Sequence, residues 1–296
     1  MNFNQTREDK VVQIEAVLRK YLPAQEGYQK EIMEAMEYSL MAGGKRLRPM
    51  LMQEAYRLFG GAGDIVEPFM AALEMIHTYS LVHDDLPAMD DDAYRRGRKT
   101  THIVYGEAMG ILAGDALLNY AFETAAAAFE MAPESSCQIG RAMTVLARKA
   151  GVHGMIGGQV VDVRSAGKQI DRKLLDFIYA LKTGALIEAA MVIGAVLAGA
   201  SDNEIEKAEQ IAHNIGMAFQ IQDDILDVTG TVEILGKPVH SDEKNDKPTY
   251  VTIEGLEEAG QDVARLSAEA LQLLSELPGD HRYMAWLIGE LIDRES

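Results

Sequence analysis

Residues 68–92 read PFMAALEMIHTYSLVHDDLPAMDDD. The apolar run 68–82 predicts a buried helix, which delivers Asp84 and Asp85 at its C-terminal end. Five aspartates fall within nine residues here, at positions 84, 85, 90, 91 and 92. Carboxylates this close repel one another and resist burial, and a helix C-terminus already carries partial negative charge. The stretch therefore predicts a bound cation or a basic surface beside this turn.

A second acidic cluster, Asp223-Asp224-Ile225-Leu226-Asp227, ends another helical run. Its four-residue spacing places Asp223 and Asp227 on one helix face. Neither cluster has His or Cys at metal-ligand spacing, and all-oxygen sites suit Mg²⁺, which binds a few carboxylates with phosphate oxygens and water. One such cluster alone is usually a solvated helix cap. Two predict a divalent-metal clamp for a phosphorylated ligand, with the clusters facing each other across one cavity.

Two basic segments favour an anion site. Residues 43–49 (GGKRLRP) place three cations after paired glycines, and residues 95–98 (RRGR) follow the first acids. This change from acidic to basic residues within a few positions fits a pocket that binds both metal ions and phosphate. The metals need carboxylates, and the remaining phosphate oxygens need guanidinium groups. His77 lies seven residues before Asp84, close to the same face. A lone histidine on an apolar helix is more often a core residue, but this alignment favours a place near the ligand.

Three polar segments interrupt the second half of the chain. Lys182-Thr183-Gly184 lies within the apolar stretch 174–200 and predicts a kink. The segment 157–162 (GGQVVD) carries polar groups that need partners if buried, so a structural use is at least as likely as a functional one. The polar loop 236–249, with three lysines, is interpreted as a mobile lid.

The composition bounds the class of protein. The chain has 296 residues, 46 Asp and Glu against 28 Lys and Arg, and a net charge of −18, which disfavours nucleic acid as a partner. Helical periodicity and the lack of a Pro, Gly or Ser-rich linker predict one all-α domain over residues 1–296, a large helical bundle around a central cavity.

The expected setting is cytoplasmic. The single Cys137 cannot form an internal disulfide, and the N-terminal residues MNFNQTREDK lack the apolar core of a signal peptide. The apolar run 189–200 is too short to span a bilayer, so we expect a buried helix and no stable membrane insertion.

With these residues in place, the chain resembles the trans-isoprenyl diphosphate synthase family, most closely its bacterial farnesyl diphosphate synthases. The motifs that carry the resemblance cover nearly the whole chain and are, in order, GGKRLRP, DDLPAMDDD with RRG, GEA with LAGDALL, GGQxxD, KTG, FQIQDDILD, and GKP with KxTY. Several are common alone, but together and in this order they are highly specific.

The resemblance implies a role for each matching position. The two aspartate-rich motifs would hold Mg²⁺ against the diphosphate of an allylic substrate, and they comprise Asp84, Asp85, Asp90, Asp223, Asp224 and Asp227. The same diphosphate would be contacted by Arg95, Lys182, Lys237 and Lys247. Isopentenyl diphosphate would be held by Lys45, Arg48, His77 and Arg96. Thr183 and Gln220 would lie beside the reacting carbon.

The resemblance also implies the reaction and its partners. The family condenses isopentenyl diphosphate with dimethylallyl or geranyl diphosphate, using three Mg²⁺ ions per site, with Mn²⁺ as an alternative ion, and the released diphosphate takes the last proton. A homodimer is implied as well. Metals and guanidinium groups aimed at the departing diphosphate would stabilise the transition state more than the ground state, and a closing apolar cavity would exclude water.

Product length is predicted from the helix that precedes the first acids. Tyr79 lies five residues before Asp84, and at about 1.5 Å rise per residue its ring would be roughly 7–8 Å deeper. A bulky ring there, beside Ser80, would form a floor for the growing chain. The resemblance likewise associates this aromatic, with four residues between Asp85 and Asp90, with a fifteen-carbon product.

Three other classes compete. An HD-type metal phosphohydrolase would need further histidine ligands and would leave the second acidic cluster unexplained. A class I terpene cyclase shares the fold and the first motif but typically replaces the second with a mixed Asn, Ser or Thr, and Glu set, which DDILD does not match. An inactive regulatory subunit of a prenyl synthase would be expected to have lost acids from one motif, and both are intact here.

Overall fold

The computed structural model describes residues 3–229 and 248–292. Its contacts divide the chain into two compact units, Met1–Gln53 with Ala62–Met143 and Glu54–Gly61 with Thr144–Ser296. Helices α3 (Leu47–Leu58) and α8 (Ser136–Ala150) each contribute residues to both units. The expectation of a single domain stays a prediction.

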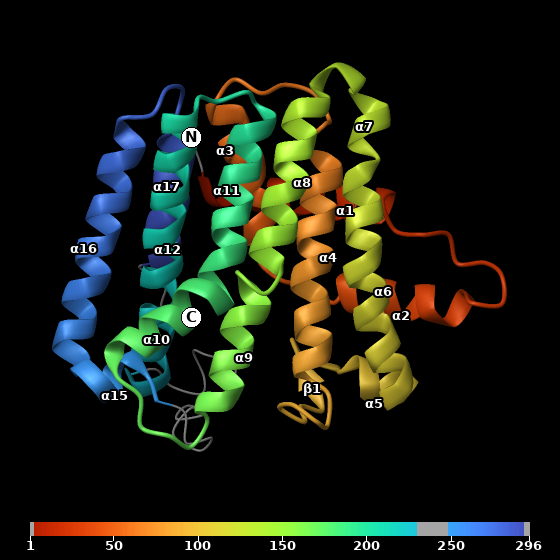
Figure 1. The fold of residues 1–296 in the computed structure, drawn as a ribbon, viewed down its shortest axis with the longest axis horizontal. Coiled ribbons are helices and arrows are strands. Elements are labelled where there is room, and N and C mark those ends of the chain that lie inside the picture. Colours follow the sequence, from red (N-terminus) through yellow and green to blue (C-terminus); the bar gives the residue numbers. More distant parts are fainter. Residues whose placement is uncertain (1–2, 230–247, 293–296) are drawn as a thin grey trace. The chain divides into compact units, whose positions relative to one another are not determined.

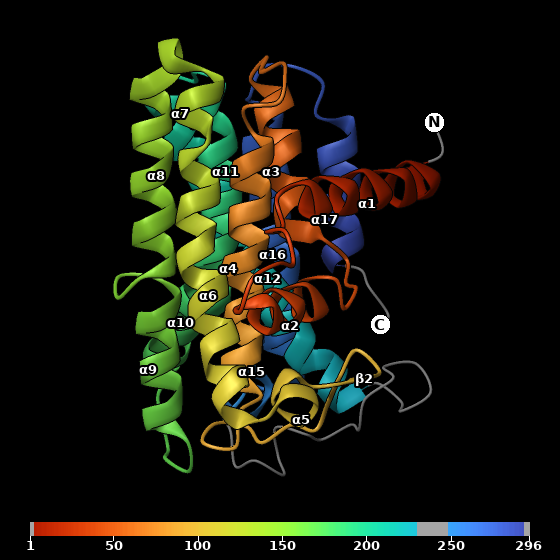
Figure 2. The same cartoon turned by 90° about the vertical axis from the view of Figure 1, so that its right-hand side faces the viewer.

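The first unit is built on α4 (Glu67–Asp84), whose residues 68–76 are all buried. A helix that is apolar on every side belongs in a core. Helix α6 (Glu107–Ala126) lies alongside α4 (Figure 1), and α1 (Phe3–Lys20) runs across it (Figure 2). The remaining elements of this unit are α2 (Lys30–Leu40), β1 (Tyr94–Arg95), β2 (Arg98–Lys99), α5 (Thr101–Tyr105), α7 (Ala128–Met131) and a 3₁₀ turn at Pro133–Ser135.

The second unit is built on α12 (Asp202–Thr229), which packs between α11 (Ala185–Leu197) and α16 (Leu256–Ser275) (Figure 1). A π-helical turn, η2, covers Tyr179–Gly184 and joins α10 to α11. The other helices of the unit are α9 (Met155–Ser165), α10 (Arg172–Ile178), α15 (Tyr250–Glu254) and α17 (Arg282–Ile292).

The helical stretch Arg172–Leu197 is long and apolar enough to cross a membrane by length and composition alone. However, 78% of its most apolar window is buried inside the protein. All 13 residues of α11 are buried. This stretch is therefore a core helix of the second unit, as the sequence predicted for residues 189–200.

The prediction of an all-α fold is confirmed. The strands of the described residues, β1 and β2, form a two-residue antiparallel hairpin in which Arg95 pairs with Arg98. The sequence did not predict this hairpin. The interruption predicted at residues 182–184 is present, and it takes the form of the π-helical turn η2.

Candidate active site

The first acidic motif is a turn that folds back on the end of α4. The helix ends at Asp84, and the backbone N–H of Asp90 donates to the Asp84 carbonyl at 2.9 Å. The N–H of Asp91, which has a left-handed φ of 53°, donates to the Leu86 carbonyl at 3.2 Å. The turn thus brings Asp84 and Asp90 together although six positions separate them.

Asp85 points inward from the same turn and is only 4% exposed. The Arg95 guanidinium, presented by β1, donates to Asp85 Oδ1 from Nη2 at 2.6 Å and from Nε at 2.7 Å. Burial nevertheless raises the pKa of Asp85 above its ordinary value, because its effect outweighs the opposing charge of Arg95. The hairpin missed by sequence reasoning therefore ties the basic segment directly to the acidic one.

The segment 43–49 forms a tight corner that begins α3. Gly43 and Gly44 have φ angles of 91° and 130°, and the Arg96 guanidinium donates to the Gly43 carbonyl. A Cβ on Gly44 would lie 2.7 Å from the Arg96 guanidinium carbon, so the glycine permits this approach. Lys45 is exposed on the corner, and Arg48 is half-buried.

His77 lies among these cations. Burial first, and then the charges of Arg48 and Arg96, hold the pKa of His77 well below its ordinary value of 6.5. The imidazole is therefore neutral near pH 7 and can offer a hydrogen bond but no charge. The structure brings together Arg48, Arg96 and His77, three of the residues predicted to bind isopentenyl diphosphate.

One cation of the corner does not belong to this set. Arg46 is 2% exposed and pairs with Glu74 at 3.0 Å, so of the three cations at residues 45, 46 and 48 this one is directed into the core. The sequence could not show this, because the partner lies on α4, far along the chain.

In the second unit, η2 presents Lys182 and Thr183 because two glycines let neighbouring helices approach it. A Cβ on Gly158 of α9 would lie 2.4 Å from the Lys182 backbone nitrogen. A Cβ on Gly216 of α12 would lie 2.9 Å from the Gly184 Cα. Backbone atoms cannot yield as a flexible side chain does, so these positions require glycine.

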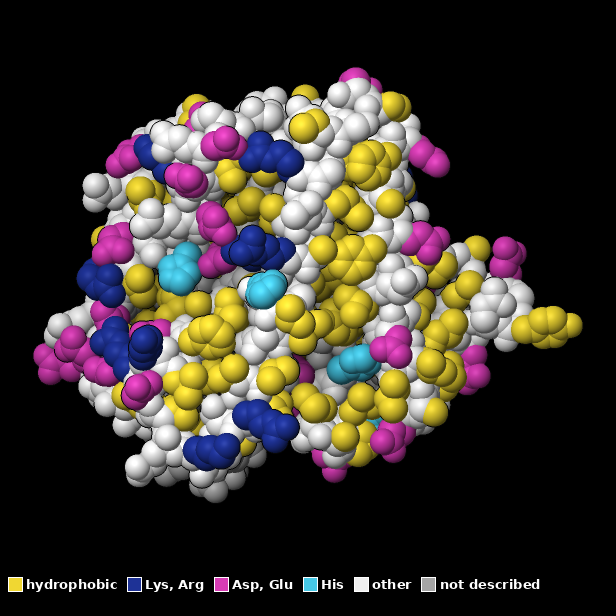
Figure 3. Space-filling view, viewed as in Figure 1, with side chains coloured by type: hydrophobic (Ala, Val, Ile, Leu, Met, Phe, Trp, Pro, Cys, Tyr) yellow, Lys and Arg dark blue, Asp and Glu magenta, His cyan; other side chains and the backbone are white. Residues whose placement is uncertain are grey.

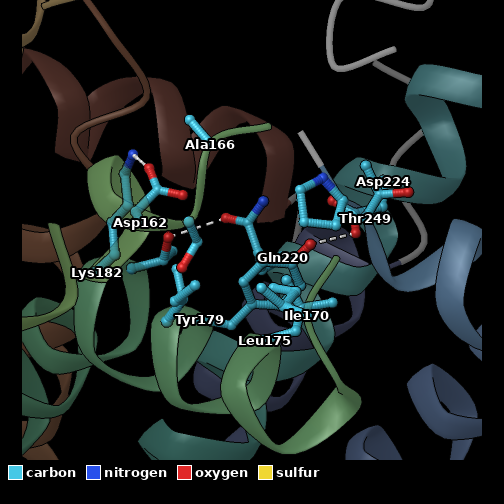
Figure 4. A pocket seen from close by; sticks show the side chains of 13 residues that line it. Asp162, Ala166, Ile170, Leu175, Tyr179, Lys182, Gln220, Asp224 and Thr249 are labelled. Carbon is cyan, nitrogen blue, oxygen red and sulfur yellow. Dashed lines mark hydrogen bonds and ion pairs between the residues drawn. The ribbon is translucent and has the colours of Figure 1, made fainter. Parts of the chain in front are cut away.

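A pocket in this unit is lined by residues of η2, α9 and α12 (Figure 4). Lys182 Nζ donates to Asp162 Oδ2 at 2.6 Å, and Thr183 Oγ1 donates to Gln220 Oε1 at 2.9 Å. Asp162, in the segment GGQVVD, therefore holds the lysine at the pocket. The predicted residues Lys182, Thr183 and Gln220 therefore share one pocket wall.

The second acidic motif borders the same pocket through Asp224, which is 2% exposed. Its Oδ2 accepts the Tyr179 hydroxyl at 2.5 Å and the Tyr250 backbone N–H at 2.7 Å. Tyr250 is set in place by Thr249, which caps α15, and by its own hydroxyl, which donates to Asp262 at 2.5 Å. Sequence reasoning missed both tyrosines, since nothing in the local pattern indicates a partner so distant in sequence.

The remaining acids of this motif differ in exposure. Asp227 is 4% exposed, whereas Asp223 is half-buried. Lys237 and Lys247, and most of the predicted lid over 236–249, lie outside the described residues. The expectation that the two acidic clusters face each other across one cavity stays a prediction.

Comparison with known proteins identifies the family. The model of the polyprenyl synthetase family matches residues 29–280. The chain is 46% identical over 258 residues to a geranylgeranyl diphosphate synthase of Cyanophora paradoxa, covering 87% of this chain and 85% of the relative. It is 43% identical over 251 residues to a farnesyl diphosphate synthase of Geobacillus stearothermophilus, covering 85% and 84%.

A solved structure supports the same family assignment. The geranyltransferase of Helicobacter pylori complexed with magnesium and isoprenyl diphosphate superposes with a TM-score of 0.84 at 30% identity, covering 99% of this chain and 97% of that one. Because the family model spans most of the chain and the relatives align along nearly their whole length, this protein belongs to the polyprenyl synthetase family of prenyltransferases, the enzymes of isoprenoid biosynthesis.

Proposed function

We propose that this protein is a cytoplasmic farnesyl diphosphate synthase. It condenses isopentenyl diphosphate with dimethylallyl diphosphate, and then with geranyl diphosphate, to give the fifteen-carbon product. Relatives named for farnesyl and for geranylgeranyl products are similarly close, so the product length depends on this chain's own residues.

Tyr79 is the observation that carries the proposed product length. Tyr79 is 6% exposed on α4, and its ring makes a T-shaped contact with the His83 ring, with 5.8 Å between centroids. Burial and the nearby Asp84 raise the pKa of Tyr79 to about 12, so the phenol stays neutral. One turn and a half below Asp84, the ring forms a fixed obstacle to a growing chain. Ser80, the next residue, has a small side chain whose hydroxyl donates to the His77 carbonyl at 2.9 Å.

The acidic side chains have the donor type that Mg²⁺ prefers. Within residues 3–229 and 248–292, no three His, Cys, Asp or Glu side chains form a ready-made metal-binding group. Mg²⁺ commonly binds only one or two carboxylates, with phosphate oxygens and water completing its shell. Asp84 and Asp90, joined by the turn, fit that requirement. We infer that the two motifs, Asp84, Asp85, Asp90, Asp223, Asp224 and Asp227, hold three Mg²⁺ ions, which Mn²⁺ could replace.

When bound, the metal neutralises charge that develops on the leaving diphosphate. The chain's own groups do the rest. Arg95 and Lys182 bind the allylic diphosphate while its C–O bond breaks and the oxygen keeps the electron pair. Isopentenyl diphosphate is oriented by Arg48, Arg96, the neutral His77 and Lys45, so that its alkene forms the new C–C bond. Thr183 and Gln220 lie beside the reacting carbon. The released diphosphate accepts the proton, and Lys237 and Lys247 are further proposed contacts of the diphosphate.

A homodimer is the assembly we propose. Ile111 and Leu112 on α6 are 42% and 53% exposed, and Phe129 on α7 is 38% exposed. Hydrophobic side chains are visible over α6 and α7 in the space-filling view (Figure 3). Apolar side chains gathered on one face are typical of a contact surface, and a second copy of the chain is the usual partner. Light scattering of the wild type and of Leu112→Glu, which should be monomeric, tests this assembly.

The product assay tests the function. The protein is incubated with Mg²⁺, isopentenyl diphosphate and dimethylallyl or geranyl diphosphate, and the product length is read by mass spectrometry. We expect a fifteen-carbon product from the wild type and from Tyr79→Phe, which keeps the ring, and longer products from Tyr79→Ala. A twenty-carbon main product from the wild type would refute the proposed length, and no product would refute the function.

A further inference from the structure

We propose that Arg46 and Glu74 form a buried ion pair that positions the isopentenyl diphosphate site without touching the substrate. The proposal rests on the proposed function, because it assigns that substrate to the corner. The sequence places Arg46 among the three cations of the corner but does not show that it is buried against Glu74. Both lie in the first unit, and the pair links the segment that carries Lys45 and Arg48 to the helix that carries His77.

The geometry shows a clamp with one guanidinium at its centre. Arg46 Nη1 donates to Glu74 Oε1 at 3.0 Å, and Nη2 donates to the Leu40 carbonyl at 2.9 Å. Nη2 also lies 3.4 Å from Glu15 Oε1. The three contacts therefore reach α4, the end of α2 and α1 from a single side chain that is fully buried.

The backbone of Arg46 explains why a clamp is needed. Its φ of 49° is left-handed, a conformation that costs energy for a residue with a Cβ. The same residue directly precedes α3, and its carbonyl accepts the Met50 N–H at 3.1 Å. The side-chain contacts hold this conformation, which sets the directions in which the adjacent Lys45 and Arg48 leave the corner.

The charges point the same way. Glu74 and His77 are three residues apart on α4, so they share a helix face. Arg46, Arg48 and Arg96 all influence His77 by their charge, and the charge of Glu74 acts on both Arg48 and Arg96. Glu74 thus offsets the repulsion among guanidinium groups that must lie close together before an anion arrives.

Stability alone does not require an ion pair at this place. A buried pair can often be replaced by apolar side chains of similar size without loss, whereas removing one partner leaves an unpaired charge. The double variant Arg46→Met/Glu74→Met therefore separates the two roles. It keeps the volume and removes the clamp.

The experiment measures the dissociation constant of isopentenyl diphosphate by calorimetry, and KM and kcat in the condensation assay. In the folded double variant we expect both the dissociation constant and the KM for isopentenyl diphosphate to rise by about 10- to 100-fold, the cost of slightly misplaced binding groups. The KM for the allylic substrate should stay near its wild-type value. Ile139→Ala, a fully buried change on α8 in the same unit, is the control for lost stability and should keep the wild-type affinity.

Wild-type affinity in the folded double variant would overturn the proposal. If the double variant does not fold, Arg46→Lys decides, because an ammonium group keeps the charge but cannot span three partners. Wild-type affinity of Arg46→Lys for isopentenyl diphosphate would then overturn the proposal, and a weaker affinity would support it. If the proposed function itself were wrong, the result would be different, because the wild type would neither bind nor convert isopentenyl diphosphate.

Discussion

Replacing Tyr179 by phenylalanine removes one hydroxyl and leaves the ring in place. That hydroxyl donates to Asp224 Oδ2 at 2.5 Å, and Tyr179 and Asp224 are 8% and 2% exposed. Both side chains are almost fully buried, so little solvent reaches the carboxylate to replace the lost donor. Because hydrogen bonds to charged groups contribute about 1.5–3 kcal/mol, we expect Tyr179→Phe to lower the free energy of unfolding by that amount.

Tyr79→Phe is the matched control. Tyr79 is equally buried, at 6% exposure, but its hydroxyl has no hydrogen-bond partner among the described residues. Removing an unpartnered buried hydroxyl costs nothing and can stabilise the protein. The assay is urea unfolding followed by circular dichroism, without Mg²⁺ or diphosphate. A Tyr179→Phe variant within about 0.5 kcal/mol of the wild type, or equal losses in both variants, would refute the reasoning.

Two further predictions follow from the site. Gly158→Ala would place a Cβ 2.4 Å from the Lys182 nitrogen, so we expect a loss of about 1–3 kcal/mol and a lower kcat. Gly260→Ala, on an open face of α16, should instead be stabilising by about 0.5–1 kcal/mol, and equal effects of the two changes on urea unfolding would contradict this. The folded pKa of His77 is depressed, so the unfolded chain takes up this proton first and stability is lost as pH falls below about 6.5. His77→Gln should therefore lose less thermal stability than the wild type between neutral and mildly acidic pH, and an identical pH dependence would count against the buried neutral imidazole.

Much of the first unit could be predicted from sequence because its signals are local. The apolar run before Asp84 does form a buried helix that ends at Asp84. Boundaries were less accurate. The periodicity predicts a first helix over residues 8–22, whereas α1 covers Phe3–Lys20, because polar residues that pack weakly still continue a helix.

The partners of the site residues could not be predicted. Asp162 pairs with Lys182, and Tyr179 with Asp224, across separations that a pattern along one helix does not report. The π-helical turn is likewise a consequence of tertiary packing, since the glycines at 158 and 216 that receive it lie on other helices. Arg46 looked like its neighbours in sequence, and only its burial against Glu74 separates it from them.

The account depends on both acidic motifs serving one reaction, although they lie in different units of the structure. Steady-state turnover of Asp84→Ala and Asp223→Ala tests this most directly, with Asp64→Ala as an exposed control. We predict that both variants keep the wild-type circular dichroism spectrum and lose at least about 100-fold in kcat, as expected when charge stabilisation is removed from a transition state. Near-normal turnover in either variant would contradict the claim.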